Sequence, residues 1–265
     1  MTTSAAPFHA AKIIQRYAAS PTVMVLELKA APTLSSFHPG QWVDFVAPPH
    51  EWVGGFSIAS CPSALPRLTL AVKRSSHAPS TWVHDESQVD MSVKLRVGGD
   101  CILAADDDTS TITKPAVFLA GGIGISPVLA QYREFHRRRR TAENNMSLST
   151  MPPTSFLYSV STEEELVFGD ELIQIFQNSR SSNSSVHDQL IFTLTQQDSW
   201  KNEATVMAND GVDRRIGRQL EPFLQSAPLE ADFYVCGPPK LLDASIALLE
   251  SRNIPLENIK CERWW

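Results

Sequence analysis

A glycine-rich turn follows a strongly apolar segment near the middle of the chain. The apolar segment covers 115–120 and runs directly into Gly121-Gly-Ile-Gly-Ile-Ser-Pro127. Glycine lets a backbone approach a phosphate closely, and the N-terminus of a following helix offers free N–H groups. The turn therefore predicts a site for nucleotide phosphates, with a tight structural turn as the alternative. We expect valine at Gly124 to block the nucleotide and to leave the fold largely intact.

A second candidate is the sequence Tyr234-Val-Cys-Gly-Pro-Pro239, which ends another apolar segment. In open α/β sheets, ligands bind at the carboxyl ends of the strands. A Gly-Pro turn at that place would leave Cys236 facing the ligand crevice. Its polarizable sulfur would border a flat cofactor without reacting covalently, whereas the simpler interpretation is a small core residue.

The chain ends in Cys261-Glu-Arg-Trp-Trp265. Exposing two tryptophan side chains to water costs free energy, so we expect them to pack against another apolar surface. Packing against the protein's own barrel is one interpretation, and stacking on an aromatic cofactor is the other. Earlier in the chain, Gly54-Gly-Phe-Ser-Ile-Ala-Ser60 places Phe56 and Ser57 on opposite faces of one strand.

The elements that would position these residues fall into two groups. The first hundred residues contain short alternating segments with turn signals between them, which predict a small antiparallel barrel. The expected strands are a first one near 12–15, then 22–28, 41–46, 56–60, 67–73 and 92–97, with a helical turn around 81–85.

After a polar stretch at 105–114 the pattern changes to strands alternating with helices, which predicts an open parallel sheet with helices on both faces. The expected strands are 115–120, 155–160, 189–194 and 231–236, and the expected helices are 127–137, 171–177 and 241–252.

Composition excludes several classes of protein. The chain has 265 residues, a net charge of −6 and a pI of about 5.6, so nothing draws it as a whole toward nucleic acid or anionic lipid. Its four cysteines are too few for a disulfide scaffold and form no CxxC pair, so we predict no metal site. The longest apolar stretch, 116–130, is too short and too interrupted to span a membrane.

The first 26 residues carry Lys12 and Arg16 but no acidic residue. We interpret them as a short lead into the first strand of a cytoplasmic protein. A mitochondrial presequence is the alternative.

Four motifs occur along the chain in a specific order. They are an aromatic-Ser-x-Ala-Ser strand at Phe56–Ser60, GGxGxxP at 121–127, YVCGPP at 234–239, and a terminal glutamate beside aromatic residues. Together they resemble the ferredoxin–NADP reductase superfamily of flavin enzymes. The resemblance covers roughly residues 10–265. VGGFS at 53–57 and the terminal CERWW are similar to one particular branch of that superfamily.

The resemblance implies an N-terminal antiparallel flavin-binding β-barrel over 1–108 and a parallel-sheet, nicotinamide-binding α/β domain over 109–265. Phe56 would lie along the flavin, and Ser57, Cys236 and Glu262 would be the catalytic residues around the place where nicotinamide C4 meets flavin N5. The cofactor-binding residues that it implies are Phe56, Ser57, Lys73, Ser80, Thr81, Gly121, Gly122, Gly124, Ser126, Pro127, Cys236, Gly237, Pro238, Trp264 and Trp265.

One position departs from the superfamily, which usually has an arginine two residues before the aromatic, paired with flavin phosphate. This chain has Gly54 there. Lys73, Arg74 or Arg96 could substitute for it, and arginine restored at Gly54 is expected to tighten flavin retention. Without a substitute, flavin binding would be weak or absent. No role is assigned to Gly55, Asp44 or His77.

The implied reaction is hydride transfer from NADH (or NADPH) to FAD (or FMN), followed by electron transfer to an unidentified acceptor, for which a separate protein is one candidate. The carboxylates at 163–165 favour NADH, although Arg214, Arg215 and Arg218 could reach a 2′-phosphate. The alternatives are a flavin-less nicotinamide-binding module for redox sensing or interaction, and a structural α/β protein that binds no nucleotide.

Overall fold

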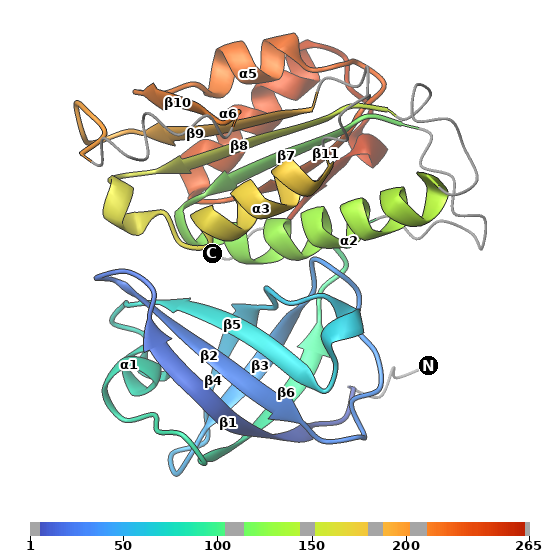
Figure 1. The fold of residues 1–265 in the computed structure, drawn as a ribbon. Coiled ribbons are helices and arrows are strands. Elements are labelled where there is room, and N and C mark those ends of the chain that lie inside the picture. The colour runs from blue at the N-terminus through green and yellow to red at the C-terminus, as the bar shows by residue number, and fades with distance from the viewer. Residues whose placement is uncertain (1–5, 104–113, 144–151, 180–187, 202–210, 263–265) are drawn as a thin grey trace.

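The structure is a computed structural model, and it describes residues 6–103, 114–143, 152–179, 188–201 and 211–262. It consists of two parts, here called the barrel half (6–103) and the sheet half (114–262), which lie one against the other (Figure 1). The expected boundary at 108/109 falls outside the described residues. Among the described residues, none of the helices combines the length and the apolar character needed to cross a bilayer.

The barrel half is one antiparallel sheet in the order β4-β3-β6-β1-β2-β5. A bridge between Ile58, just after β4, and Leu70 on β5 brings the two edge strands together, so the sheet curls into a barrel. Its strands are β1 (His9–Ala18), β2 (Val23–Ala30), β3 (Trp42–Ala47), β4 (Trp52–Ser57), β5 (Arg67–Lys73) and β6 (Ser92–Gly98).

Alternating apolar side chains fill the barrel interior, because successive residues of a strand face opposite sides. Leu26 and Leu28 on β2 are fully buried, as are Leu68 and Leu70 on β5. The helix α1 (Ala78–Asp85) packs on β3, β4 and β5 and inserts the indole of Trp82, which lies 5.8 Å from the Phe45 ring centroid. The helix is longer than the turn expected at 81–85, because it begins at Ala78 rather than within the motif.

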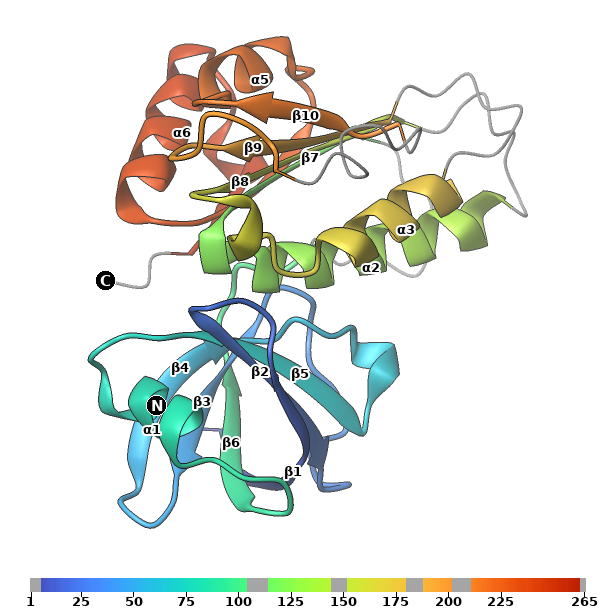
Figure 2. The same ribbon diagram turned by 60° about the vertical axis from the view of Figure 1, so that its left-hand side comes forward.

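The sheet half is a parallel sheet in the order β10-β9-β8-β7-β11-β12. The helices α2 (Ile125–Glu143) and α3 (Gly169–Ser179) cover the face toward the barrel, and α5 (Leu220–Ser226) and α6 (Pro239–Ser251) cover the far face (Figures 1 and 2). The strands are β7 (Ala116–Gly121), β8 (Thr154–Val160), β9 (Gln189–Leu194), β10 (Asp213–Ile216), β11 (Asp232–Cys236) and β12 (Ile259–Cys261).

The predicted fold class is confirmed, with an antiparallel barrel followed by a parallel α/β sheet. Among the α-helices and strands of the described residues, β10, β12 and α5 were not expected. Residues 9–18 form the ten-residue strand β1, in which Ile13 is fully buried. Much of the stretch with presequence-like composition is therefore part of the barrel.

Candidate functional site

The sheet half has its topological switch point between β7 and β11. From β7 the chain moves outward to β8, β9 and β10, and then returns to β11 on the other side of β7. Ala120 pairs with Cys236 at the carboxyl ends of these two strands. The glycine-rich turn and the Gly-Pro turn therefore leave the sheet side by side, at the place where α/β sheets bind ligands.

Glycine is needed in these turns for two different reasons. A Cβ at Gly124 would lie 2.4 Å from the carbonyl oxygen of Cys236, and a Cβ at Gly121 would lie 2.8 Å from Cδ of Pro238. These two glycines let the turns pack on each other. Gly122 differs, because its φ is +51° and a Cβ there would meet no atom of the described residues within 4 Å. The expectation that valine at Gly124 leaves the fold largely intact was therefore wrong, because that side chain would disrupt the packing between the turns. That valine there blocks the nucleotide stays a prediction.

The first turn of α2 presents a polar group with no partner. Ser126 is 1% exposed, and its hydroxyl oxygen makes no hydrogen bond within the part of the chain that the structure describes. A buried hydroxyl without a partner is unusual, because leaving it unsatisfied costs free energy. Ser126 also lines the cavity described next, so a ligand in that cavity could satisfy it.

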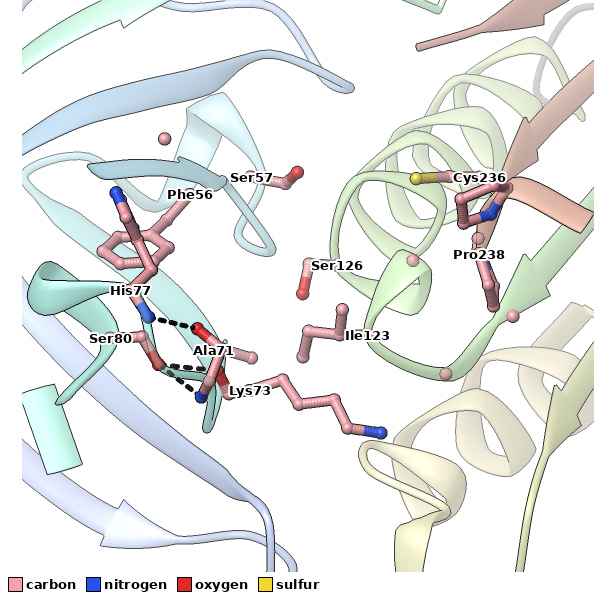
Figure 3. Close-up of a pocket in the computed structure, with 17 residues that line it drawn as sticks. Phe56, Ser57, Ala71, Lys73, His77, Ser80, Ile123, Ser126, Cys236 and Pro238 are labelled. Atoms are coloured by element: carbon pink, nitrogen blue, oxygen red, sulfur yellow. Dashed lines mark hydrogen bonds between the residues drawn. The ribbon is translucent and has the colours of Figure 1, made fainter. Parts of the chain in front are cut away.

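A cavity of about 700 Å³ lies between the two halves. Its barrel wall includes Phe56 and Ser57 at the end of β4, and its opposite wall includes Cys236 and Pro238 (Figure 3). The Phe56 ring packs edge-on to Phe45 at 5.6 Å between centroids, which holds it against the barrel core. Although the strand pattern places Phe56 and Ser57 on opposite faces, both line this cavity.

The lower barrel wall is formed by the end of β5 and the start of α1. The Ser80 hydroxyl donates to the carbonyl oxygen of Lys73 at 2.8 Å and accepts from the backbone N–H of Ser75 at 3.0 Å. The Ser75 hydroxyl accepts from the N–H of His77 at 3.3 Å. These bonds tie the segment together internally. Lys73 extends from it across the cavity toward the sheet half (Figure 3).

Gly54 is closed off by the same helix. A Cβ at this position would lie 2.7 Å from Cβ of Pro79, so the helix occupies the space that a longer side chain would need. Of the three basic residues expected to substitute for arginine here, Lys73 alone lines the cavity. Arg74 pairs with Asp85 at 2.7 Å, and Arg96 pairs with Asp44 at 2.6 Å.

The carboxylates after β8 have partners elsewhere. Glu163 accepts the backbone N–H of Lys201 at 2.7 Å, and Glu164 lies 3.8 Å from the Lys201 ammonium. Glu165 faces the barrel half, where it accepts from the Thr22 hydroxyl at 2.6 Å and lies 3.7 Å from the Lys73 ammonium. Each of the three carboxylates thus already has a partner within the protein, and the preference for NADH based on them stays a prediction.

Glu262 also contacts the barrel half. Its Oε1 accepts a hydrogen bond from the indole N–H of Trp42 at 2.6 Å. Burial raises the pKa of the Glu262 carboxyl, and the Trp42 hydrogen bond opposes that rise. Glu262 is not among the described residues that line the cavity. It fastens the end of β12 to β3.

Comparison with known proteins shows the family to which the chain belongs. Residues 118–246 match the model of the oxidoreductase NAD-binding domain. The chain is 32% identical over 264 residues to human oxidoreductase NAD-binding domain-containing protein 1, covering 97% of this chain and 80% of the human protein. The Danio rerio protein is 33% identical over 261 residues, covering 96% of this chain and 91% of that protein. The chain belongs to the oxidoreductase NAD-binding domain-containing protein 1 family.

The fold of this family member is that of the ferredoxin reductases. A ferredoxin NADP⁺ reductase from Neisseria gonorrhoeae, solved with bound FAD and NADP, superposes with a TM-score of 0.69 at 17% identity, covering 97% of this chain and 99% of that one. The resemblance seen in VGGFS and CERWW, and in the order of the four motifs, is thus confirmed at the level of family and fold.

The structure brings most of the expected site residues together in this member of the oxidoreductase NAD-binding domain-containing protein 1 family. Thr81, Pro127 and Glu262 are not among the described lining residues, and Trp264 and Trp265 lie outside the described residues. The expected residues that line the cavity are Phe56, Ser57, Lys73, Ser80, Gly121, Gly122, Gly124, Ser126, Cys236, Gly237 and Pro238.

Sequence reasoning missed six lining residues: Gly55, Ala71, Ser75, His77, Ile123 and Pro239. Gly55, Ile123 and Pro239 lie within the motif segments themselves, at positions to which no role was assigned. Ala71 lies two residues before Lys73 and shares its side of β5. His77 carried no local signal, because only the turn from β5 into α1 brings it to the cavity.

Proposed function

We propose that this protein is an NAD(P)H-dependent flavin oxidoreductase. It would bind a flavin, FAD or FMN, against the barrel half and a reduced nicotinamide nucleotide, NADH or NADPH, against the sheet half. Electrons would then pass to an acceptor that remains to be identified.

One observation carries the proposal: a single cavity has the expected flavin residues on one wall and the expected nucleotide residues on the other. Holding two reactants in one orientation is the main contribution that a protein makes to such a transfer. The buried Ser126 hydroxyl, which has no partner among the described residues, and the open space at Gly122 fit a polar ligand in this cavity. The cavity is of ordinary size for a ligand site.

On the flavin side, we assign Phe56 to pack along the ring and Ser57 to hydrogen-bond near N5. When bound, a flavin supplies the redox chemistry: a hydride carries two electrons from nicotinamide C4 to N5, and a proton from solvent completes the reduced ring. Cys236 borders the meeting point of the two rings, where its buried sulfur helps to exclude water.

On the nucleotide side, we assign the phosphates to the turn at Gly122 and to the N-terminus of α2. The free N–H groups and the dipole of that helix favour an anion. The Ser126 hydroxyl would donate to a nucleotide oxygen. Glu262 acts indirectly in this proposal, since it fastens the chain end to Trp42.

The test is reduction of flavin by the purified full chain. With added FAD or FMN and NADH, in the absence of oxygen, the visible absorption of the flavin should disappear much faster than in protein-free solution. Repeating the measurement with NADPH gives the nucleotide preference. A rate equal to that of the protein-free control would reject the proposal.

The closed position at Gly54 favours a second candidate, a nicotinamide-binding module without flavin. Calorimetry separates the two. Binding of NADH together with no binding of FAD, FMN or riboflavin would support the module. Binding of both cofactor types supports the oxidoreductase.

A further inference from the structure

The flavin wall of the cavity is poor in groups that can hold a phosphate, and this bears on how the proposed flavin substrate binds. The inference rests on the proposed function. FMN carries a phosphate and FAD a pyrophosphate at the end of the ribityl chain. Proteins hold such groups with arginine forks, lysines or free N–H groups.

Among the described residues, Arg74 and Arg96, the two arginines considered as substitutes at Gly54, are both paired outside this wall. The guanidinium of Arg74 makes two bonds to the Asp85 carboxylate, at 2.7 and 3.2 Å. Arg96 bonds to Asp44 and stacks on the ring of Phe8, 4.6 Å from its centroid. Among the described residues that line the cavity, the basic side chains are Lys73 and His77.

The start of α1 is also a weak anion site. Pro79 lies in its first turn, and proline has no N–H to offer. The hydroxyls of Ser75 and Ser80 already take part in the internal network described above. The Thr81 hydroxyl donates to the carbonyl oxygen of Ser75 at 3.3 Å.

The positive charge of Lys73 is compensated from the other half of the molecule. Its ammonium lies 3.7 Å from the Glu165 carboxylate. The Glu165 side chain is only 15% exposed and is held by the Thr22 hydroxyl at 2.6 Å. A phosphate approaching Lys73 would therefore meet a carboxylate already in place, and like charges repel.

We propose that the cavity holds free flavin by its ring and ribityl chain, that the phosphate contributes little, and that Glu165 sets this preference by neutralising Lys73. The flavin is then a diffusible substrate, taken up oxidised and released reduced. The closed position at Gly54 is consistent with this mode, because no side chain there reaches toward a phosphate.

Binding measurements with three flavins test the substrate class. Riboflavin, FMN and FAD are titrated into the protein, and quenching of flavin fluorescence gives each dissociation constant. The three values should agree within about fivefold, because a compensated, partly exposed charge contributes little. FAD bound more than about 30-fold tighter than riboflavin would overturn the inference while leaving the proposed function intact. No binding of any flavin would overturn the proposed function itself.

A pair of variants tests Glu165. Glu165→Gln removes the charge that compensates Lys73. The affinity for FMN should therefore rise about three- to tenfold relative to that for riboflavin at low salt, and this rise should disappear at high salt. Thr22→Val removes a bond to Glu165 but keeps its charge, so the ratio should stay unchanged. Adding Lys73→Met to Glu165→Gln should abolish the gain.

Comparing the ratio of two flavins within one variant cancels any general loss of folded protein. An unchanged ratio in Glu165→Gln, or an equal shift in Thr22→Val, would show that Glu165 does not set the preference.

Discussion

Gly122 and Gly124, two positions apart in the same turn, have different roles. Gly122 faces open space in the cavity with a left-handed backbone, and Gly124 lies against the backbone of Cys236. The motif gives both the same letter, so the sequence predicts a phosphate turn but not which glycine faces the ligand. That distinction depends on the neighbouring turn after β11.

We expect alanine to act differently at the two positions. Gly122→Ala should cost about 1–2 kcal/mol in the free energy of unfolding, because its φ of +51° strains an L-residue, and should weaken NADH binding. Gly124→Ala should cost about 3 kcal/mol or more, because its methyl group meets a backbone oxygen. Denaturant unfolding and calorimetry with NADH measure both effects. Equal stability of the two variants would contradict the assignment.

Other residues were predictable to the degree that their motif was local. Phe56, Ser57 and Cys236 lie at strand ends, and their strands could be read from the sequence. Glu165 could not be assigned, because its partners Thr22 and Lys73 are 143 and 92 positions away along the chain and meet it only in the folded protein.

At the scale of elements, segments with a long apolar run or clear alternation were predicted well, as at β5 and β7. The missed elements are short and weakly patterned. β10 consists of Asp-Arg-Arg-Ile and has four residues, and β12 has three. Both lie at the edges of the parallel sheet, where pairing with β9 or β11 decides their structure and local propensity does not.

The helix α2 shows how burial overrides a polar sequence. It carries four consecutive arginines at 137–140, yet Arg139 is only 2% exposed and pairs with Asp188 at 2.7 Å. His136 on the same helix is buried, with its ring 4.3 Å from that of Tyr132. Its Nε2 makes no hydrogen bond to any residue that the structure describes.

This helix should make stability depend on pH. Burial lowers the pKa of His136 to about 3. Above the unfolded pKa of about 6.5, His136 is neutral in both the folded and the unfolded chain. Below it only the unfolded chain binds the proton, so the free energy of unfolding decreases as the pH is lowered. Between pH 6.5 and 5 this group should cost about 2 kcal/mol. Denaturant unfolding of the wild type and of His136→Phe, which keeps a flat ring, should show a smaller loss in the variant. Equal losses would mean that His136 is protonated in the fold.

At the scale of the whole molecule, the cavity depends on the register of the two halves, that is, on their fixed position relative to each other. An apolar cluster joins them: Val23, Val25 and Ala71 of the barrel half pack with Val167 of the sheet half. Polar contacts surround it, including the Gln131 amide on the Cys101 carbonyl oxygen at 2.8 Å and the bond between Trp42 and Glu262. The proposed reaction needs this register, because each half would hold one of the two rings.

A substitution that leaves a void in this apolar cluster should therefore slow the proposed reaction more than it weakens binding of flavin or NADH. Val167→Ala should cost about 2 kcal/mol of stability and slow flavin reduction at saturating NADH and flavin by about three- to tenfold, because small misplacements of two reactants are costly. Val160→Ala is the matched control, since Val160 is also 3% exposed but belongs to a different apolar cluster from the one that packs Val167 on β2 and β5. It should lose similar stability and keep its rate in stopped-flow measurements. If both variants slow equally, general loosening explains the effect; if Val167→Ala alone slows, the contact between the halves sets the distance between the rings.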